Sequence, residues 1–414
     1  MKKVLRHRAE GGKTPSANSF NSTESRNMFS ISRLQQLLQD MPWGAFDGAV
    51  RKHRGDRHCK GFDSRKHVVA MLYAQLSDIS SLRQLEASFN QHTRHHYHLR
   101  VEPLRRSTVS DANRLRNPQI FAETVQALMQ RAGRCVRSDR KYMLYLLDST
   151  TISLQGRGFD WTAATATRHR GLKLHLMYAR DGNCPVFHSI TSANVNDVTE
   201  GQKFPIQAGA TYVFDKGYCN YNWWHRFTAA RARVVTRPKK NAALVLHQVR
   251  PVSEGDAGLI LADQVEGFKH SSNRAGHKNQ HAPSHVRRIA VHRPGEEPLV
   301  LVTNDLESPA TEIAQLYKER WQIELFFKWI KQHLQVKRFL GRSENAVRIQ
   351  LLIALIAYLL VLIYKQKHGL KATLWHVLAE IRGGLMHRVE PALSGWRERK
   401  KQRAYLATLQ PRLL

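Results

Sequence analysis

Residues 141–152 read KYMLYLLDSTTI and decide the fold class of this chain. The stretch is short and almost continuously apolar up to Asp148, which is typical of a strand in the centre of a sheet. Further strands and one helical stretch are predicted after it, with the turn ARDGN between the second and third strands. These segments are LKLHLMYA (172–179), CPVFHSIT (184–191), ATYVFDKGY (210–218), the helical NYNWWHRFTAA (220–230) and ARVVTR (232–237). Strands that alternate with helices in this order predict an α/β domain.

The chain before this domain is predicted to be helical over residues 29–138. Apolar residues recur at helical spacing in SRLQQLLQDM, RKHVVAMLYAQL and IFAETVQALMQRA. Short helices with turns and many arginines favour a DNA-binding domain, and the alternative is an ordinary helical bundle. Residues 1–28 are polar and lack periodicity, which predicts disorder. The sequence leaves open whether translation starts at Met1 or Met28.

Residues 237–299 are more polar and interrupt the domain that begins with 139–236. Only fragments such as AALVLHQV, GLILAD and RRIAVH look like strands, so this segment is predicted to be a β-rich insertion. The domain resumes over 300–366, with the strand PLVLVTN and then two long helices at about 309–335 and 344–366.

The last segment, 367–414, is predicted to be a basic helical region containing RERKKQR. The strongest apolar stretch, 351–363, is about 13 residues long, which is shorter than the roughly 20 needed to cross a bilayer. It therefore predicts a buried helix and no membrane partner. The N-terminal MKKVLRHRAEGG has no apolar run after its charges, and the four cysteines form no CxxC pair. Both features favour a cytoplasmic protein.

The net charge is +32, from 65 Lys and Arg against 33 Asp and Glu. Such an excess points to a polyanion, and nucleic acid is the simplest one. The alternatives are a basic protein kept soluble by its charge and a protein bound to an anionic membrane. Because the basic residues run along the whole chain, nucleic acid is the favoured partner. In HTRHHYH, the histidines His92, His95, His96 and His98 lack regular ligand spacing and favour a basic surface loop over a metal site.

Two aspartates follow apolar strands. Asp148 closes the first strand and Asp215 closes the fourth. An unpaired charge there is costly to bury, although one such aspartate alone is most simply a capping residue. Two at neighbouring strand ends indicate a site. Other acids compete for this role, namely Asp160, Asp181, Asp197 and Asp305, and Asp197 either caps a helix or lies at the rim of the site.

A third carboxylate lies in YKERWQIELFFKWIK, residues 317–331. On one continuous helix with about 100° per residue, a narrow face of about 80° carries a single acid among cations and a phenol. This face consists of Tyr317, Arg320, Glu324, Lys328 and Lys331. A lone carboxylate among groups that hold phosphate, beside buried apolar residues, suits a metal ligand.

Three converging carboxylates predict a magnesium site. Mg²⁺ takes one or two carboxylates and keeps positions for water and phosphate oxygens. Two such ions, roughly 3.5–4 Å apart, clamp the attacking and leaving oxygens of a phosphoryl displacement. We expect Asp148, Asp215 and Glu324 to hold two Mg²⁺ ions, with Mn²⁺ as the substitute.

The same residues carry a family signature. Tyr317, Arg320, Glu324 and Lys331 match the spacing Tyr, two residues, Arg, three residues, Glu, six residues, Lys. Together with DST after the first strand, DKGY after the fourth and LVTNDL before the Glu helix, they make the chain resemble the DDE transposases of bacterial insertion sequences, specifically the insertion-sequence-four family. The resemblance covers roughly residues 29–380.

The resemblance implies a ribonuclease-H-like mixed sheet core with a β-rich insertion between the second Asp and the Glu. It also implies metal-dependent chemistry on double-stranded DNA. Water first cuts one strand at the transposon end. The freed 3′-hydroxyl then attacks the opposite strand, often giving a hairpin that is reopened, and finally attacks target DNA.

Residue roles follow from the resemblance as well. Asp148, Asp215 and Glu324 would be the catalytic metal ligands. Phosphates of the terminal inverted repeats would be contacted by Tyr317, Arg320 and Lys331, with Lys328 as a further candidate. A homodimer is expected because two ends must be brought together, and a DNA-bound enzyme is expected at the nucleoid.

One feature departs from the family. Relatives use a Trp of the insertion to stack on a flipped base, but residues 237–299 contain no Trp and only Phe268 as an aromatic. Phe268 either stacks or is a core residue, so the stacking role stays unassigned. Trp161 is predicted in a loop that approaches DNA, and the core is predicted to hold Trp223, Trp224 and Trp321.

Two other functions compete with an active transposase. The first is a catalytically inactive, transposase-derived DNA-binding protein, and the presence of all three acids argues against it. The second is a ribonuclease-H-like nuclease that only hydrolyses, and the phosphate-binding Tyr, Arg and Lys argue for strand transfer instead. The sequence does not give the terminal repeat, the target preference or the role of the basic C-terminal region.

Overall fold

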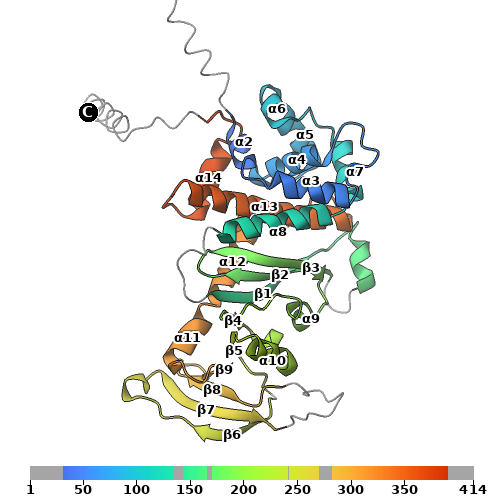
Figure 1. The fold of residues 1–414 in the computed structure, drawn as a ribbon. Coiled ribbons are helices and arrows are strands. Elements are labelled where there is room, and N and C mark those ends of the chain that lie inside the picture. Colours follow the sequence, from blue (N-terminus) through green and yellow to red (C-terminus); the bar gives the residue numbers. More distant parts are fainter. Residues whose placement is uncertain (1–30, 135–142, 166–169, 241, 270–281, 390–414) are drawn as a thin grey trace, which may run out of the picture.

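The structure is a computed structural model that describes residues 31–134, 143–165, 170–240, 242–269 and 282–389. The predicted disordered residues 1–28 and the RERKKQR stretch lie outside the described residues. Helices form one layer and a long sheet extends away from it (Figure 1). The N-terminal helices are α2 (Arg33–Leu38), α3 (Trp43–Lys52), α4 (Ser64–Leu76), α5 (Leu82–Asn90), α6 (Thr93–Leu99), α7 (Arg106–Leu115) and α8 (Gln119–Arg134).

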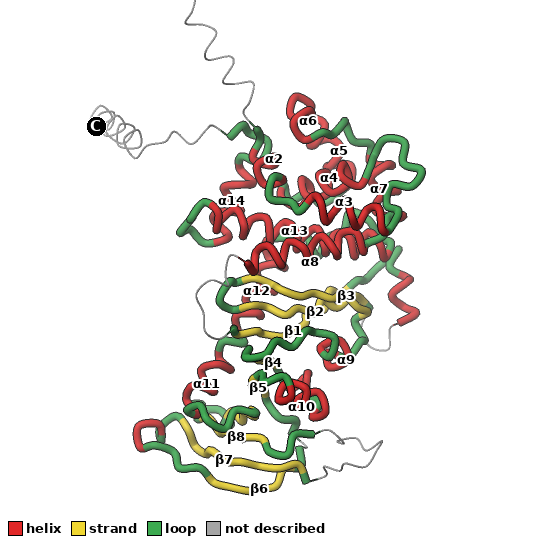
Figure 2. Tube along the Cα trace, in the orientation of Figure 1, coloured by secondary structure: helices red, strands yellow, loops and turns green. Residues whose placement is uncertain are grey.

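One nine-stranded sheet runs through the rest of the described chain, in the order β3-β2-β1-β4-β5-β9-β8-β7-β6 (Figure 2). Its strands are β1 (Leu144–Ser153), β2 (Gly171–Ala179), β3 (Cys184–Ser192), β4 (Thr211–Phe214), β5 (Arg233–Thr236), β6 (Leu244–Val249), β7 (Ile260–Phe268), β8 (Val286–Val291) and β9 (Leu299–Thr303). Short helices lie between them, namely η1 (Asp160–Thr165), α9 (Asp197–Gly201), η2 (Lys216–Tyr218), α10 (Tyr221–Ala229) and η3 (Glu254–Asp256).

The sheet is mixed. β1, β4 and β5 are parallel neighbours, and β2 and β3 pair antiparallel beside β1. β9 pairs antiparallel with β5 and carries β8, β7 and β6 outward. The strands of the predicted insertion therefore extend the same sheet.

Alternating side chains of β1 reach two different cores, as the pleat of a strand requires. Leu144 and Leu146 are buried in the core that includes the C-terminal helices. Tyr145 and Leu147 are buried in a second core together with residues of α10 such as Trp223. Because both faces of β1 are covered by apolar cores, the sequence of this strand is a nearly continuous apolar run.

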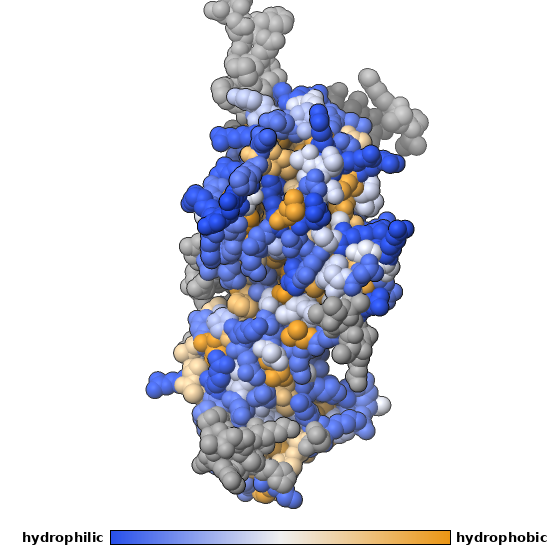
Figure 3. Space-filling view, turned by 90° about the vertical axis from the view of Figure 1, so that its right-hand side faces the viewer, coloured by the Kyte–Doolittle hydropathy of each residue, from blue (hydrophilic) through white to orange (hydrophobic). Residues whose placement is uncertain are grey.

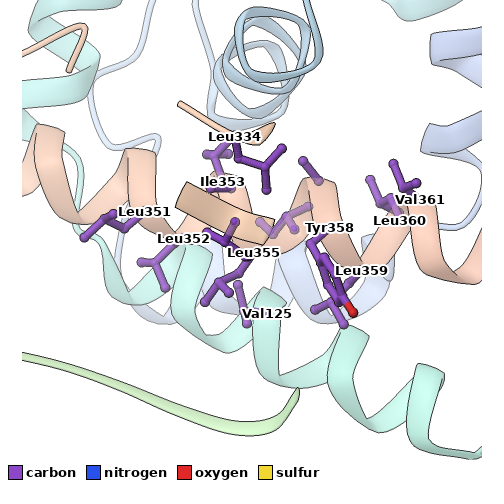
Figure 4. Close-up of a cluster of buried hydrophobic side chains, with 14 of the residues drawn as sticks. Val125, Leu334, Leu351, Leu352, Ile353, Leu355, Tyr358, Leu359, Leu360 and Val361 are labelled. Carbon is purple, nitrogen blue, oxygen red and sulfur yellow. The ribbon is translucent and has the colours of Figure 1, made fainter. Parts of the chain in front are cut away.

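Helix α13 (Glu344–Lys367) ties the helical layer to the sheet domain. It packs against α8, α4 and α7, and α8 in turn packs against β3. Figure 4 shows its apolar side chains, including Ile353 and Leu355, together with Val125 of α8 and Leu334. By length and composition α13 could cross a membrane, but 94% of its most apolar window is buried inside the protein. It is a core helix here, as predicted.

The predicted continuous helix over 309–335 is wrong, because the chain forms two helices. α11 (Ala310–Lys318) ends before Glu319, and α12 (Trp321–His333) begins after Arg320. The signature therefore spans a helix junction, with Tyr317 on α11 and Arg320 at the N-cap of α12. The last described helix is α14 (Leu374–Gly383).

Two other predictions need correction. Trp321 is 57% exposed, because it opens α12 on the side away from the buried Ile323 and shares that side with the exposed Leu325. The histidine cluster forms the helix α6 instead of a loop, with His95 and His96 buried. Within the described residues no group of His, Cys, Asp or Glu side chains forms a ready-made metal cluster.

A buried ion pair joins the insertion strands to α11. Arg287 of β8 is 2% exposed and donates from Nε and Nη2 to both carboxylate oxygens of Asp263 on β7, at 2.9 and 2.7 Å. Its Nη1 donates to the carbonyl oxygen of Ser308, just before α11, at 2.5 Å. The pair therefore helps to hold the helix that carries Tyr317.

We expect Arg287→Met to lower the free energy of unfolding by about 3 kcal/mol, because Asp263 would stay buried without its closest cation. Arg250, whose Nε lies 3.6 Å from Asp263, still provides a counter-charge, so the expected loss lies at the lower end of the range for a broken buried ion pair. Chemical denaturation of Arg287→Met, Asp263→Leu and the double variant measures this. An additive double variant would contradict the coupling, since removing both charges together should recover much of the loss.

Candidate active site

The structure brings the first two predicted acids to neighbouring positions. β1 and β4 pair in parallel up to Leu147 and Phe214, and Asp148 and Asp215 are the next residues on the two strands. Asp215 follows the end of β4, as predicted, and N-caps η2. Asp148 does not close its strand, because β1 continues to Ser153 in antiparallel pairing with β2. What ends at Asp148 is the parallel pairing with β4.

Burial has the largest influence on the pKa of Asp148. It raises the pKa of this carboxyl to about 6, opposed by the backbone N–H of Ser149, which donates to Oδ1 at 2.8 Å. The nearby Arg320 lowers this pKa and the nearby Glu324 raises it. The third predicted acid is therefore close enough to act on the first.

Glu324 reaches this place because α12 packs against β1. Its Oε1 accepts a hydrogen bond from Nη1 of Arg320 at 2.6 Å, one turn earlier. The Arg320 guanidinium lies over the ring of Tyr317, 5.6 Å from its centroid. The two helices thus meet with the arginine between the phenol and the carboxylate.

Asp215 contacts a phenol and a second arginine. The Tyr317 hydroxyl donates to its Oδ1 at 3.3 Å, and Nη1 of Arg237 lies 3.9 Å from the same oxygen. Sequence reasoning missed Arg237. It directly follows β5, the parallel neighbour of β4, so the rule that parallel strands end at one edge of a sheet could have found it.

The two lysines of the predicted face differ. Lys331 is half-buried, and burial and the neighbouring Lys337 lower its pKa while the charge of Asp148 raises it. Lys331 therefore lies near the acids. Lys328 is exposed on α12, on the side of Trp321 and Leu325, and the described contacts do not connect it to the three acids.

The donor set fits a hard divalent cation, since three carboxylates come from three elements that meet at one edge. In this arrangement Arg320 is the cation that faces Glu324 and Asp148. The acids are not yet gathered into a cluster of three metal ligands among the described residues. Asp148, Asp215 and Glu324 are the residues that would hold such a cation.

Asp197 lies near the residues that follow Asp148 and Asp215. Its Oδ1 accepts from the hydroxyl of Ser149 at 2.8 Å and from Nζ of Lys173 at 3.1 Å. Its Oδ2 lies 3.6 Å from where a side chain at Gly217 would begin. Asp197 therefore sits between the residue after Asp148 and the turn after Asp215, closer to the site than a helix-capping role requires. The cap of α9 is Asn196.

Burial identifies three of the aromatic candidates as core residues. Trp223 and Trp224 are 2% exposed, so both are core residues as predicted. Phe268 is 7% exposed and packs on the ring of Tyr221, with centroids 4.2 Å apart, so it belongs to the core as well. Trp161 lies in η1, where its indole N–H donates to the carbonyl oxygen of Arg342 at 2.8 Å.

Comparison with known families matches the chain in two places. The family described as the transposase DDE domain matches residues 139–360, which contain all three acids and the Tyr-Arg-Glu-Lys signature. A family described as a domain of unknown function, DUF4372, matches residues 30–101 in the helical layer.

Several relatives carry transposase names. A protein of Sinorhizobium fredii assigned as transposase y4zB is 44% identical over 254 residues, covering 61% of this chain and 69% of the relative. A protein of Geobacillus stearothermophilus assigned as the transposase for insertion sequence element IS5377 is 28% identical, covering 55% of this chain and 59% of the relative. Among solved structures, a piggyBac transposase synaptic complex with hairpin DNA aligns at 10% identity with a TM-score of 0.39.

The family match spans more than half of the chain, and the fold agrees with it. The mixed sheet with its helical N-terminal layer is a ribonuclease-H-like α/β fold. DNA is the partner of such a protein, and a divalent metal is its usual cofactor. The chain belongs to the DDE transposases of insertion sequence elements, enzymes with DNA nuclease and strand-transfer activity.

Proposed function

We propose that this transposase binds the terminal inverted repeats of its own insertion sequence and carries out magnesium-dependent strand cleavage and strand transfer. The observation that supports the proposal is the adjacency of two acids on paired strands, with a third acid near the first. Asp148 and Asp215 lie side by side where β1 and β4 stop pairing, and Glu324 acts electrostatically on Asp148.

Asp148, Asp215 and Glu324 would hold two Mg²⁺ ions, for which Mn²⁺ can substitute. When bound, the ions supply a water nucleophile and charge stabilisation at the phosphate that is cut. The protein contributes a fixed frame, because two of the acids are on paired strands and the third is on a helix packed against one of them. Asp197 supports that frame by contacting the segments that follow both aspartates.

The cations beside the acids would hold the DNA end. With Glu324 engaged by a metal ion, the planar guanidinium of Arg320 would be available to hold a phosphate. Tyr317 and Lys331 flank it, and Lys328 would contact DNA further out on the exposed side of α12. Arg237, next to Asp215, is a further phosphate contact that this geometry supports.

The wider organisation is proposed on the same basis. Residues 29–138 would form a DNA-binding domain, ahead of a catalytic core of 139–236 and 300–366 that is interrupted by the insertion 237–299. Residues 367–414 would be a basic C-terminal region. Two copies would pair the two ends at the nucleoid, and the freed 3′-hydroxyl would pass through a hairpin before it attacks target DNA.

Incubation of the protein with a labelled duplex of the inverted repeat that flanks its coding sequence tests this function. With Mg²⁺ we expect cleavage at the repeat end, then hairpins on the transposon end and joined products when target plasmid is added. With EDTA we expect binding alone. Nicks without joined products would indicate a nuclease that only hydrolyses, and binding without nicks would indicate an inactive DNA-binding protein.

A further inference from the structure

The chain between α12 and α13, residues 334–343, crosses from the acids to the helical layer. It starts beside Lys331, whose pKa responds to both Asp148 and Lys337. Its next-to-last residue is Arg342, whose Nη1 donates to the carbonyl oxygen of Arg157 at 2.9 Å. The crossing segment therefore links the acids to the loop that follows β1.

The same path continues to α7. Immediately after the crossing segment, Nδ2 of Asn345 donates to the carbonyl oxygen of Arg114, the next-to-last residue of α7, at 3.0 Å. Helix α13 packs along α7 at this point. The acids, the crossing segment, the loop after β1 and α7 therefore form one connected series of elements.

This path is strongly cationic. The crossing segment reads LQVKRFLGRS and contains three cations and no acid. Lys337, Arg338, Arg342, Arg157 and Arg114 are all exposed. The acids at its far end are already paired, since Asp111 contacts Arg114 at 3.3 Å and Glu344 contacts Arg348 at 2.8 Å. Arg114 is itself paired with Asp111, but among the described residues no ion pair holds Lys337, Arg338, Arg342 or Arg157, so these charges are available to a ligand.

Helix α7 at the end of the path is poorly covered. Only Val109, Ala112 and Asn113 of this helix are buried, and its other residues are exposed. The exposed residues include Arg106, Ser107 and Ser110, which can donate to phosphates and base edges. The side of the molecule that carries α7 is largely hydrophilic in Figure 3.

We propose that this path, the cationic track, binds one phosphate backbone of the element's terminal repeat and leads the duplex from the active site to α7, which reads bases inside the repeat. The track consists of Lys331, Lys337, Arg338, Arg342, Arg157 and Arg114. It rests on the proposed function and adds the course and direction of the bound DNA. The element end is the occupant because the track starts beside Lys331, next to the acids that would cut that end.

Salt dependence tests the track without catalysis. Each phosphate contact contributes a slope of about −0.9 in a plot of log affinity against log salt. We expect Lys337→Ala with Arg338→Ala to reduce the slope by about two for a 40-base-pair duplex of the terminal repeat in EDTA. The matched control, Lys269→Ala with Lys371→Ala, removes the same charge from exposed positions off the track and leaves the slope unchanged. Equal slopes in both double variants would overturn the proposal.

The direction of the DNA is tested by tethered cleavage. In a Cys59→Ser, Cys135→Ser background, an iron chelate attached to Lys337→Cys should cut the repeat near its end. The same chelate on Ser110→Cys should cut further inside. The same cut position from both sites would overturn the proposed course, and so would cuts from Ser110→Cys that show no preference for the repeat over a scrambled duplex, as target DNA would give. Because both tests omit Mg²⁺, they can succeed even if no cleavage activity is found, or fail while cleavage persists.

Discussion

Glu324→Gln is expected to reduce strand cleavage at the repeat end by at least about 10³-fold, because losing a metal ligand removes several kcal/mol of transition-state stabilisation. The glutamine keeps the shape of the side chain and a hydrogen bond from Arg320 but not the charge. DNA binding in EDTA should stay within about threefold of the native protein, since Glu324 repels phosphate. The measurement is single-turnover cleavage of a labelled repeat duplex.

Glu319→Gln is the matched control, five residues earlier in the chain. Oε2 of Glu319 lies 3.7 Å from Nε of Arg180, which hydrogen-bonds to Leu144 at the start of β1, four residues before Asp148. We expect cleavage by this variant to remain within a few-fold of native. If Glu324→Gln cleaved as well as Glu319→Gln, the metal-ligand role of Glu324 would be excluded.

Asp148→Asn is expected to abolish cleavage and at the same time to stabilise the metal-free protein. Burial raises the pKa of Asp148 to about 6, above its ordinary value of 3.8. The folded protein therefore binds more protons than the unfolded chain between these values, and stability falls as pH rises through that window. Above it, the ionised carboxylate destabilises the fold by roughly 3 kcal/mol, which the neutral amide avoids.

The stabilisation by Asp148→Asn is expected to depend on pH. In EDTA at pH 7.5, Asp148→Asn should unfold at a higher temperature than the native protein. At pH 4.5 the difference in stability should shrink to about 1 kcal/mol, because the native carboxyl is then mostly protonated. Mg²⁺ should stabilise the native protein at pH 7.5 and leave the variant unchanged. Asp160→Asn, an exposed acid on η1, should show none of these effects. A variant less stable than native at pH 7.5 would contradict the destabilising burial of the Asp148 carboxylate.

The sequence predicts the strands and the site well where the signal is local. Each apolar run from 141 to 236 forms the predicted element, and Asp148 and Asp215 are side by side because the two strands are parallel neighbours. Family spacing identifies Glu324 without knowledge of the helix that holds it. These features depend on burial patterns and fixed spacings that one sequence displays directly.

Features that depend on contacts between distant segments escape sequence reasoning. The break between α11 and α12 carries no local sequence signal, because residues 310–335 contain neither proline nor glycine. The exposure of Trp321 follows from which side of α12 meets the sheet, which its amino-acid type does not reveal. Arg237 and Asp197 enter the site through neighbouring strands and turns, and only the pairing order of the sheet makes them visible.

The buried position of α13 also has a consequence for synthesis of the protein. The helices of residues 31–134 are translated first, but the helix that covers α4, α7 and α8 begins only at Glu344, 210 residues after Arg134. At about 5–20 residues per second, this delay is roughly 10–40 s. During that time the nascent helical layer lacks its apolar partner on the ribosome. A truncated chain that stops before α13 would therefore leave this surface uncovered and would not yield a stable DNA-binding fragment.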